Sequence, residues 1–279
     1  MRRHLSQSWR RNRLGWRGLA DSLGVRTALS VAPLLFGFLA PVAVPAAGFD
    51  RVQVNVADPQ AAAQWYAKNL VGRVTTVDSV PAVAFGETTI LFSKAEGKIA
   101  GSVGSAVDHL GFSYEDLDAT MKRFSGSGVK IVSGIEKDGP IRYAFINDPW
   151  STLIEVVEDP DLHGFHHIHL ATTDLRATLK WYTDVFGGKV TRFAGLIAGI
   201  RYGNAWVLVK TVDRPLVPTK DRAIDHVRWP VADLPATTKK LRARGAHFEG
   251  ARADSTGKHP VFVFGPDGVR IELVGHAAD

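Results

Sequence analysis

Three histidines stand at the same place in a repeated segment of the chain. They begin three of four octapeptides, which start at Arg51, His109, His167 and His226 and all end in Asp. The starts are separated by 58, 58 and 59 positions, so one supersecondary unit is used four times. An imidazole at a fixed strand position can serve as a metal ligand, although a lone His on a strand is more often a structural residue.

The pattern within each octapeptide predicts the elements that position these residues. Apolar residues alternate with mostly polar ones, which indicates a half-buried strand whose first residue lies on the face opposite the apolar side. The closing Asp is a favoured helix N-cap. Trp-Tyr pairs follow at 65–66 and 181–182, where we expect them in the helix core. Strand-like runs separated by Gly turns complete each unit.

The four units fall into two halves. Units two and four close with a turn and a strand that carries Glu155 or Glu272, whereas units one and three resemble each other in their helices. Asp159-Pro160-Asp161 is the expected linker. We therefore predict two tandem domains, 48–160 and 163–276.

The net charge of +6 comes from the N-terminal segment. Residues 1–47 carry seven Arg and one acid, and residues 48–279 carry 27 basic and 27 acidic residues. The folded part therefore has no overall basic bias, which argues against nucleic acid as a partner. The chain has no Cys, which excludes disulfides, thiolate metal sites and a Cys nucleophile.

Residues 1–47 are typical of an export signal. An Arg-rich stretch ends at Arg26, an uncharged apolar run follows over 28–44, and Ala46-Ala47 fits a cleavage site. We expect the cleaved protein to be periplasmic or secreted. The alternative is an uncleaved membrane anchor that holds the protein outside the cytoplasm, although three Pro residues would shorten any spanning helix.

The β-α-β-β-β unit, its Asp-capped helix and the closing Glu strand resemble the vicinal oxygen chelate superfamily. This is the group of glyoxalases, bleomycin-resistance proteins and extradiol dioxygenases, and the resemblance covers 49–275. It implies an α+β fold in which four βαβββ units form two tandem cupped-sheet domains. In that family the metal ligands are the first-strand residue seven positions before the capping Asp and a Glu in the last strand.

The resemblance implies a metal site in domain 163–276. Its ligands would be His167, His226 and Glu272, while Leu208 at the fourth place would leave a position open. Two imidazoles and one carboxylate suit a catalytic divalent metal, Fe(II) first, with Mn or Zn as alternatives.

The same comparison implies that domain 48–160 is metal-free. Arg51 and Leu91 occupy two of its ligand places, and His109 and Glu155 occupy the others. A fixed guanidinium cation repels a divalent ion. We therefore expect His109 and Glu155 to form a hydrogen bond or an ion pair with Arg51 instead.

Three further residues are candidate substrate contacts or supports for the metal ligands. They are His169, Arg228 and His259. The likeness to extradiol dioxygenases does not extend to proton transfer, because Phe262 stands where those enzymes carry a Tyr ten residues before the ligand Glu. The catalytic proton-transfer residues are therefore left unassigned.

The leading hypothesis is a metal-dependent enzyme, dioxygenase-like or lyase/isomerase-like, with a ligand layout most like that of extradiol dioxygenases. Its substrate would be a small molecule that chelates the metal through vicinal oxygens. The alternative is a metal-free small-molecule-binding protein of the bleomycin-resistance type. A homodimer is left open, and a membrane is expected as a partner only if the N-terminal segment is uncleaved.

Overall fold

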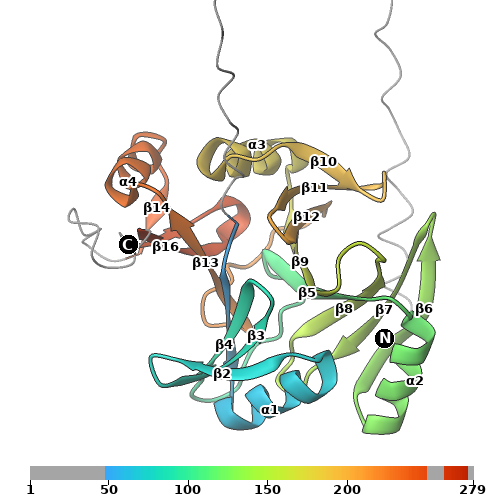
Figure 1. Cartoon of the computed structure of the whole chain (residues 1–279). Helices are drawn as coiled ribbons and strands as arrows, with labels where there is room; N and C mark the ends of the chain where they lie inside the picture. The colour runs from blue at the N-terminus through green and yellow to red at the C-terminus, as the bar shows by residue number, and fades with distance from the viewer. Residues whose placement is uncertain (1–47, 250–260, 276–279) are drawn as a thin grey trace, which may run out of the picture. The chain divides into compact units, whose positions relative to one another are not determined.

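The computed structural model describes residues 48–249 and 261–275, and the predicted export segment lies outside these ranges. Four βαβββ units follow one another in this part of the chain (Figure 1). Unit one contains β1 (Arg51–Val56), α1 (Pro59–Leu70), β2 (Arg73–Val77), β3 (Val80–Phe85) and β4 (Thr88–Lys94). Unit two contains β5 (Val107–Tyr114), α2 (Leu117–Ser127), β6 (Lys130–Asp138), β7 (Ile141–Asn147) and β8 (Leu153–Glu158).

The second half of the chain repeats this order. Unit three contains β9 (Gly164–Thr172), α3 (Leu175–Phe186), β10 (Val190–Phe193), β11 (Ile197–Tyr202) and β12 (Ala205–Thr211). Unit four contains β13 (Ile224–Val231), α4 (Leu234–Ala243), β14 (His247–Phe248), β15 (Val261–Phe264), the 3-10 turn η1 (Pro266–Gly268) and β16 (Arg270–Gly275). The predicted repeat of four units is confirmed.

The units pair across the sequence to form two sheets. The first sheet has the order β14-β15-β16-β13-β1-β4-β3-β2, and the second sheet has the order β10-β11-β12-β9-β5-β8-β7-β6. The first sheet therefore joins units one and four, and the second joins units two and three. The α+β class is confirmed, with four βαβββ units forming two sheets. Each sheet combines one unit from 48–160 with one unit from 163–276, so neither half of the chain forms a sheet alone.

Linker lengths explain this pairing. Units two and three are joined by the short segment 159–163, which turns the chain so that β9 lies antiparallel to β5 in the same sheet. The longer segments 95–106 and 212–223 connect one sheet to the other. A segment of about a dozen residues can span between sheets at little extra entropic cost.

The two longer linkers run alongside each other. Ala223 N–H donates to Ala100 O at 2.8 Å, and the Arg222 guanidinium donates to Gly101 O at 2.6 Å. These two hydrogen bonds hold the two linkers together.

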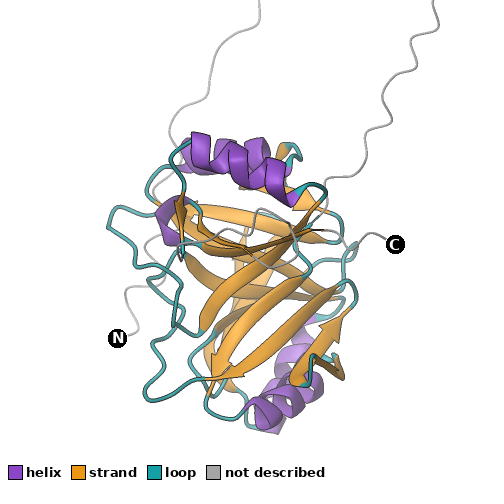
Figure 2. Cartoon of the chain, turned by 90° about the vertical axis from the view of Figure 1, so that its left-hand side faces the viewer, coloured by secondary structure: helices purple, strands orange, loops and turns teal. Residues whose placement is uncertain are grey.

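Each helix begins after the Asp that closes its octapeptide, as predicted. Asp58 Oδ1 accepts hydrogen bonds from the N–H groups of Gln60 and Ala61 at 3.0 Å. The other three helices are capped in the same way by Asp116, Asp174 and Asp233. The apolar strand faces pack with the helices into one core, and in Figure 2 the strands lie between helices at the periphery. The opposite, polar faces of the strands lie away from this core and are available to form binding sites.

The described residues contain no helix that is both long enough and apolar enough to cross a bilayer.

The repeated Trp-Tyr pairs allow a matched test of the core. Tyr66 and Tyr182 are both buried, as expected, but only the Tyr66 hydroxyl donates to a carboxylate, Asp148 Oδ2 at 2.8 Å. The Tyr182 hydroxyl has no hydrogen-bond partner among the described residues.

We predict that Tyr66→Phe lowers the free energy of unfolding by about 1–3 kcal/mol, because a buried carboxylate loses a donor. Tyr182→Phe removes no hydrogen bond and should leave the free energy of unfolding nearly unchanged. Urea denaturation followed by tryptophan fluorescence compares the two variants. Equal losses would contradict the role given to Asp148.

Candidate metal centre

Four buried side chains of the second sheet converge on one point. His109 comes from β5, Glu155 from β8, and His167 and His169 from β9, and each is at most 2% exposed. Their ligand atoms all lie within 4.8 Å of one another. No other group of three or more such residues occurs in 48–249 and 261–275.

Strand register brings these residues together. In the β5–β9 pair, His109 lies opposite His169 and Gly111 lies opposite His167. Glu155 lies beside Gly111 in the parallel β5–β8 pair. Because alternate residues of a strand share one face, all of them project from the polar face of the sheet.

Gly111 provides the space for one of the ligands. A Cβ atom at this position would lie 2.0 to 2.4 Å from three atoms of the His167 ring. Real Cβ atoms do not approach other heavy atoms so closely. The absence of a side chain at Gly111 is therefore what allows the imidazole to lie across β5.

Glu155 is surrounded by three imidazoles. Its Oε2 atom lies 2.9 Å from His109 Nε2, 3.2 Å from His167 Nε2 and 3.9 Å from His169 Nδ1. Burial alone would raise the pKa of Glu155, but hydrogen bonds from His109 and its neighbours hold it well below its usual range. The carboxylate is therefore ionised, as metal ligation requires.

The three histidines differ in protonation. Burial lowers the pKa of His167 to about 3, and burial together with the charge of His109 lowers that of His169 to about 4. For His109, burial is outweighed by hydrogen bonds to Asp108 and Glu155, which raise its pKa. Two imidazoles are thus neutral at pH 7, and binding of a metal ion would displace the proton of the third to solvent.

A second layer of polar groups fixes the orientation of two ligands. Asp108, the extra residue of a bulge in β5, lies 2.8 Å from His109 Nδ1 and 2.8 Å from Lys210 Nζ. The ligand-side nitrogen of His109 is therefore Nε2. Carboxylate partners of this kind are typical of metal-binding histidines.

His166 has the same role for His167. Strict alternation along β9 would place His166 on the apolar side, but a second bulge puts its Nδ1 2.7 Å from His167 Nδ1. Its Nε2 lies 3.1 Å from Asp159 Oδ2. His167 can thus donate from Nδ1 through His166 toward a carboxylate, which directs Nε2 at the cluster.

The donor set fits a divalent metal. Three imidazole nitrogens and one carboxylate oxygen are donors suited to Zn, Fe, Mn, Co or Ni. His167 Nε2 is buried and, although it is 3.2 Å from Glu155, makes no hydrogen bond of acceptable geometry to any described residue. A metal ion would satisfy this nitrogen.

The predicted ligands are divided between the two sheets. His167 is in the cluster, whereas His226 and Glu272 lie in the first sheet, with His226 Nε2 3.6 Å from Glu272 Oε2. The expectation that His167, His226 and Glu272 share one site is therefore wrong, because units three and four belong to different sheets. His109 and Glu155, which we assigned to a metal-free domain, take the vacant places.

The other candidates have separate outcomes. His169 joins the cluster beside His167 as a further ring nitrogen. Arg228 lies in the first sheet, 3.5 Å from Asp50 Oδ2, and His259 lies outside the described residues. The expected pairing of His109 and Glu155 exists, but Arg51 takes no part in it because it lies in the first sheet.

An apolar cover lies over the cluster. It consists of Ile141, Tyr143, Val157, Phe193, Trp206 and Leu208, with Phe145, Leu162 and Ile197 packed against them. Leu208, at the expected fourth ligand place, lies beside His169 in the β9–β12 pair and is buried. The Phe145 ring centroid is 5.3 Å from that of His109. The surroundings of the cluster are therefore apolar and aromatic.

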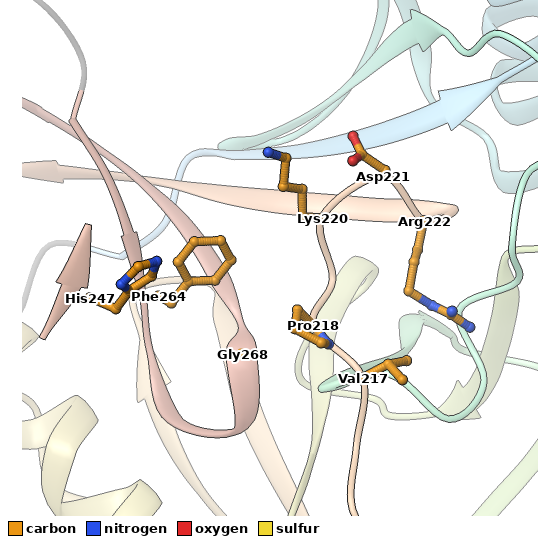
Figure 3. A pocket seen from close by; sticks show the side chains of 8 residues that line it. All are labelled: Val217, Pro218, Lys220, Asp221, Arg222, His247, Phe264 and Gly268. Atoms are coloured by element: carbon orange, nitrogen blue, oxygen red, sulfur yellow. The ribbon is translucent and has the colours of Figure 1, made fainter. Parts of the chain in front are cut away.

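A separate pocket of about 630 Å³ lies elsewhere on the chain. In Figure 3, Lys220 and Arg222 on one segment are separated from His247 and Phe264 on the other side. None of its lining residues belongs to the cluster. The chemistry of the four-residue cluster makes it the stronger candidate site.

Solved structures support the fold. Glyoxalase I from Zea mays matches with a TM-score of 0.66 and 17% identity, over 81% of this chain and 92% of that one. A putative dioxygenase from Bacillus subtilis subsp. subtilis str. 168 matches with a TM-score of 0.63 and 15% identity, over 84% of this chain and 86% of that one. No curated protein matches the chain at a significant level.

A family model matches both halves of the sequence. It covers residues 48–161 and 164–273, close to the two domains expected from the repeats. Its matches together span well over half of the chain. The chain therefore belongs to the Glyoxalase/Bleomycin resistance protein/Dioxygenase superfamily.

Proposed function

We propose that this protein is a metal-dependent enzyme whose metal is held in the second sheet by His109, Glu155 and His167, with His169 as an additional ligand or substrate contact. The substrate class is a small molecule that offers two adjacent oxygen atoms. The observation that carries the proposal is the buried convergence of three imidazoles on one carboxylate, with His167 Nε2 lacking a hydrogen bond.

A bound metal ion and the protein side chains would make different contributions to the reaction. A divalent metal supplies Lewis acidity that stabilises negative charge developing on a bound oxygen, and Fe(II) is the first choice for this donor set, ahead of Mn or Zn. Asp108 and His166 hold the two ligand rings in a single orientation. The apolar cover excludes water, which strengthens electrostatic interactions at the site.

The cover also favours a substrate class. Phe145 contacts His109, Phe193 contacts His166, and Trp206 lies beside His167 in the β9–β12 pair. Such ring surfaces suit an apolar or aromatic molecule. The same cover supports a second candidate function, a metal-free protein that binds an aromatic molecule. Metal analysis separates the two functions.

We predict that untagged wild-type protein, purified anaerobically, contains stoichiometric metal by elemental analysis. His167→Ala and Glu155→Gln should remove it, because each deletes a ligand. The matched variants His226→Ala and Glu272→Gln should retain it, since these residues lie in the other sheet. Metal loss confined to the His226 and Glu272 variants would contradict the assignment, and a metal-free wild type would favour the binding protein.

Gly111→Ala should abolish metal binding without adding or removing a ligand. The new Cβ would occupy the space of the His167 ring and push it away from Glu155. Gly126→Ala is the control, because no atom lies within 4 Å of its added Cβ. Metal content is measured beside circular dichroism, and a folded Gly111→Ala protein with full metal content would refute the packing argument.

Loss of the His166 side chain should weaken metal binding without abolishing it. His166→Ala should weaken metal affinity by about 10- to 100-fold, the usual effect of losing a partner of a metal-bound His. His163→Ala, a nearby histidine with no hydrogen bond to a described residue, should leave the affinity unchanged. Competition with a chromophoric chelator measures both affinities, and identical values for the two variants would exclude this role for His166.

A further inference from the structure

The polar face of the first sheet corresponds to the metal centre strand for strand. Asp225, the extra residue of a bulge in β13, lies 2.5 Å from His226 Nδ1, just as Asp108 supports His109. His226 also lies near Glu272, which stands where Glu155 stands in the second sheet. Half of the metal centre is therefore reproduced.

The other half is replaced by cations and an amide. By position in the repeat, Arg51 replaces His167, Gln53 replaces His169, and Arg228 replaces Gly111. Arg51 and Arg228 are directly opposite each other in the antiparallel β1–β13 pair, so their side chains leave the same face. Arg228 also lies opposite Glu272 in the β13–β16 pair.

This arrangement brings the like charges of Arg51 and Arg228 close together. Like charges directly opposite in a sheet are destabilising. Burial lowers the pKa of Arg51, and the neighbouring charge of Arg228 lowers it further. Among the described residues, the Arg51 guanidinium has no hydrogen bond or ion pair, and Arg228 Nε is buried without a partner. Two guanidinium groups on one face thus have unused donors.

Two of the neighbouring acids are already engaged, whereas Asp50 keeps one buried oxygen without a hydrogen-bond partner among the described residues. Asp225 pairs with Arg270 and with His226, and Glu272 faces His226. Asp50 lies 3.5 Å from the terminal nitrogen of Arg228 and leaves its Nε free. Arg51 feels the charges of Glu272, Asp50 and Asp78, but it forms no ion pair or hydrogen bond with a described residue, so its guanidinium donors are free to bind a ligand.

This face is also more open than the metal centre. The Arg228 side chain is 25% exposed and that of Glu272 14%, whereas the Glu155 side chain is 3% exposed. A ligand from solvent can therefore reach the two arginines.

We propose that the first sheet binds a small oxyanion, a carboxylate or a phosphate, between the guanidinium groups of Arg51 and Arg228. Planar guanidinium groups match both anions through paired, charge-assisted hydrogen bonds. Gln53 and His226 lie opposite each other on the same face, two residues along each strand, and can contact the remainder of the ligand. The two sheets would then hold a metal and an anion at equivalent places.

Calorimetric titration of the full chain with inorganic phosphate, and separately with succinate, tests this proposal at low ionic strength. We expect saturable binding of at least one anion and at least tenfold weaker binding in Arg51→Gln and in Arg228→Gln. Arg176→Gln removes an exposed Arg on α3, which belongs to the other sheet's units, and should bind like wild type. The preferred anion distinguishes a carboxylate ligand from a phosphate ligand.

His167→Ala locates the bound anion, because it disables the metal centre alone. Binding that survives in His167→Ala but is lost in Arg51→Gln supports the proposal, whether or not the protein contains metal. Binding lost in His167→Ala but kept in Arg51→Gln places the anion at the metal centre and overturns it. The proposal also fails if neither anion binds, or if folded Arg51→Gln and Arg228→Gln proteins bind like wild type.

Discussion

The antiparallel pairing of β5 with β9 is the contact on which the candidate metal centre depends. These two strands come from different halves of the sequence, and their register alone puts His109 opposite His169 and Gly111 opposite His167. A shift by one residue would turn every one of these side chains to the apolar face. The bulges in this pair add Asp108 and His166 beside the ligand rings. One strand pair therefore supplies three of the four converging residues and their supports.

The equivalent pairing of β1 with β13 has a different chemical result on the same scaffold. His226 and its bulge carboxylate are retained, but Arg51 and Arg228 replace a ligand and the glycine that makes room for it. A neutral imidazole can bind a metal cation, whereas a guanidinium attracts an anion. Replacing one by the other therefore reverses the charge of the ligand that fits. The repeat thus fixes positions in space, while side-chain identity at three or four of them decides what each sheet can hold.

Much of this could be predicted from the sequence, because it depends on local pattern. The strands and the capping Asp residues followed from the octapeptides. The candidate ligand places, at the first strand position and the closing Glu, were implied by the resemblance to the vicinal oxygen chelate superfamily. The pairing of units into sheets could not be predicted in this way, because the repeats alone do not show which unit pairs with which. The short linker 159–163 and the longer ones at 95–106 and 212–223 contain that information, but only once sheet pairing is considered.

The roles of Gly111 and His166 at the cluster could not be predicted from the sequence pattern. Gly111 acts by the volume that it leaves empty, and a glycine in a strand does not by itself reveal which ring will fill it. Simple alternation places His166 on the apolar side, and it cannot predict the bulge that turns His166 toward His167. A clue was present, since Asp108 and Asp225 also precede histidines that begin octapeptides.

The nested pairing of the units has a consequence for how the chain reaches its native state. The second sheet is built from the continuous stretch 107–211, so its strands can associate as soon as that stretch is available. The first sheet must wait for β13, far along the chain, before β1 gains its second neighbour. Contacts of such sequence separation form slowly, and an unpaired strand edge invites association with other chains. Until the last unit arrives, β1 therefore has an unpaired edge that is open to misassembly.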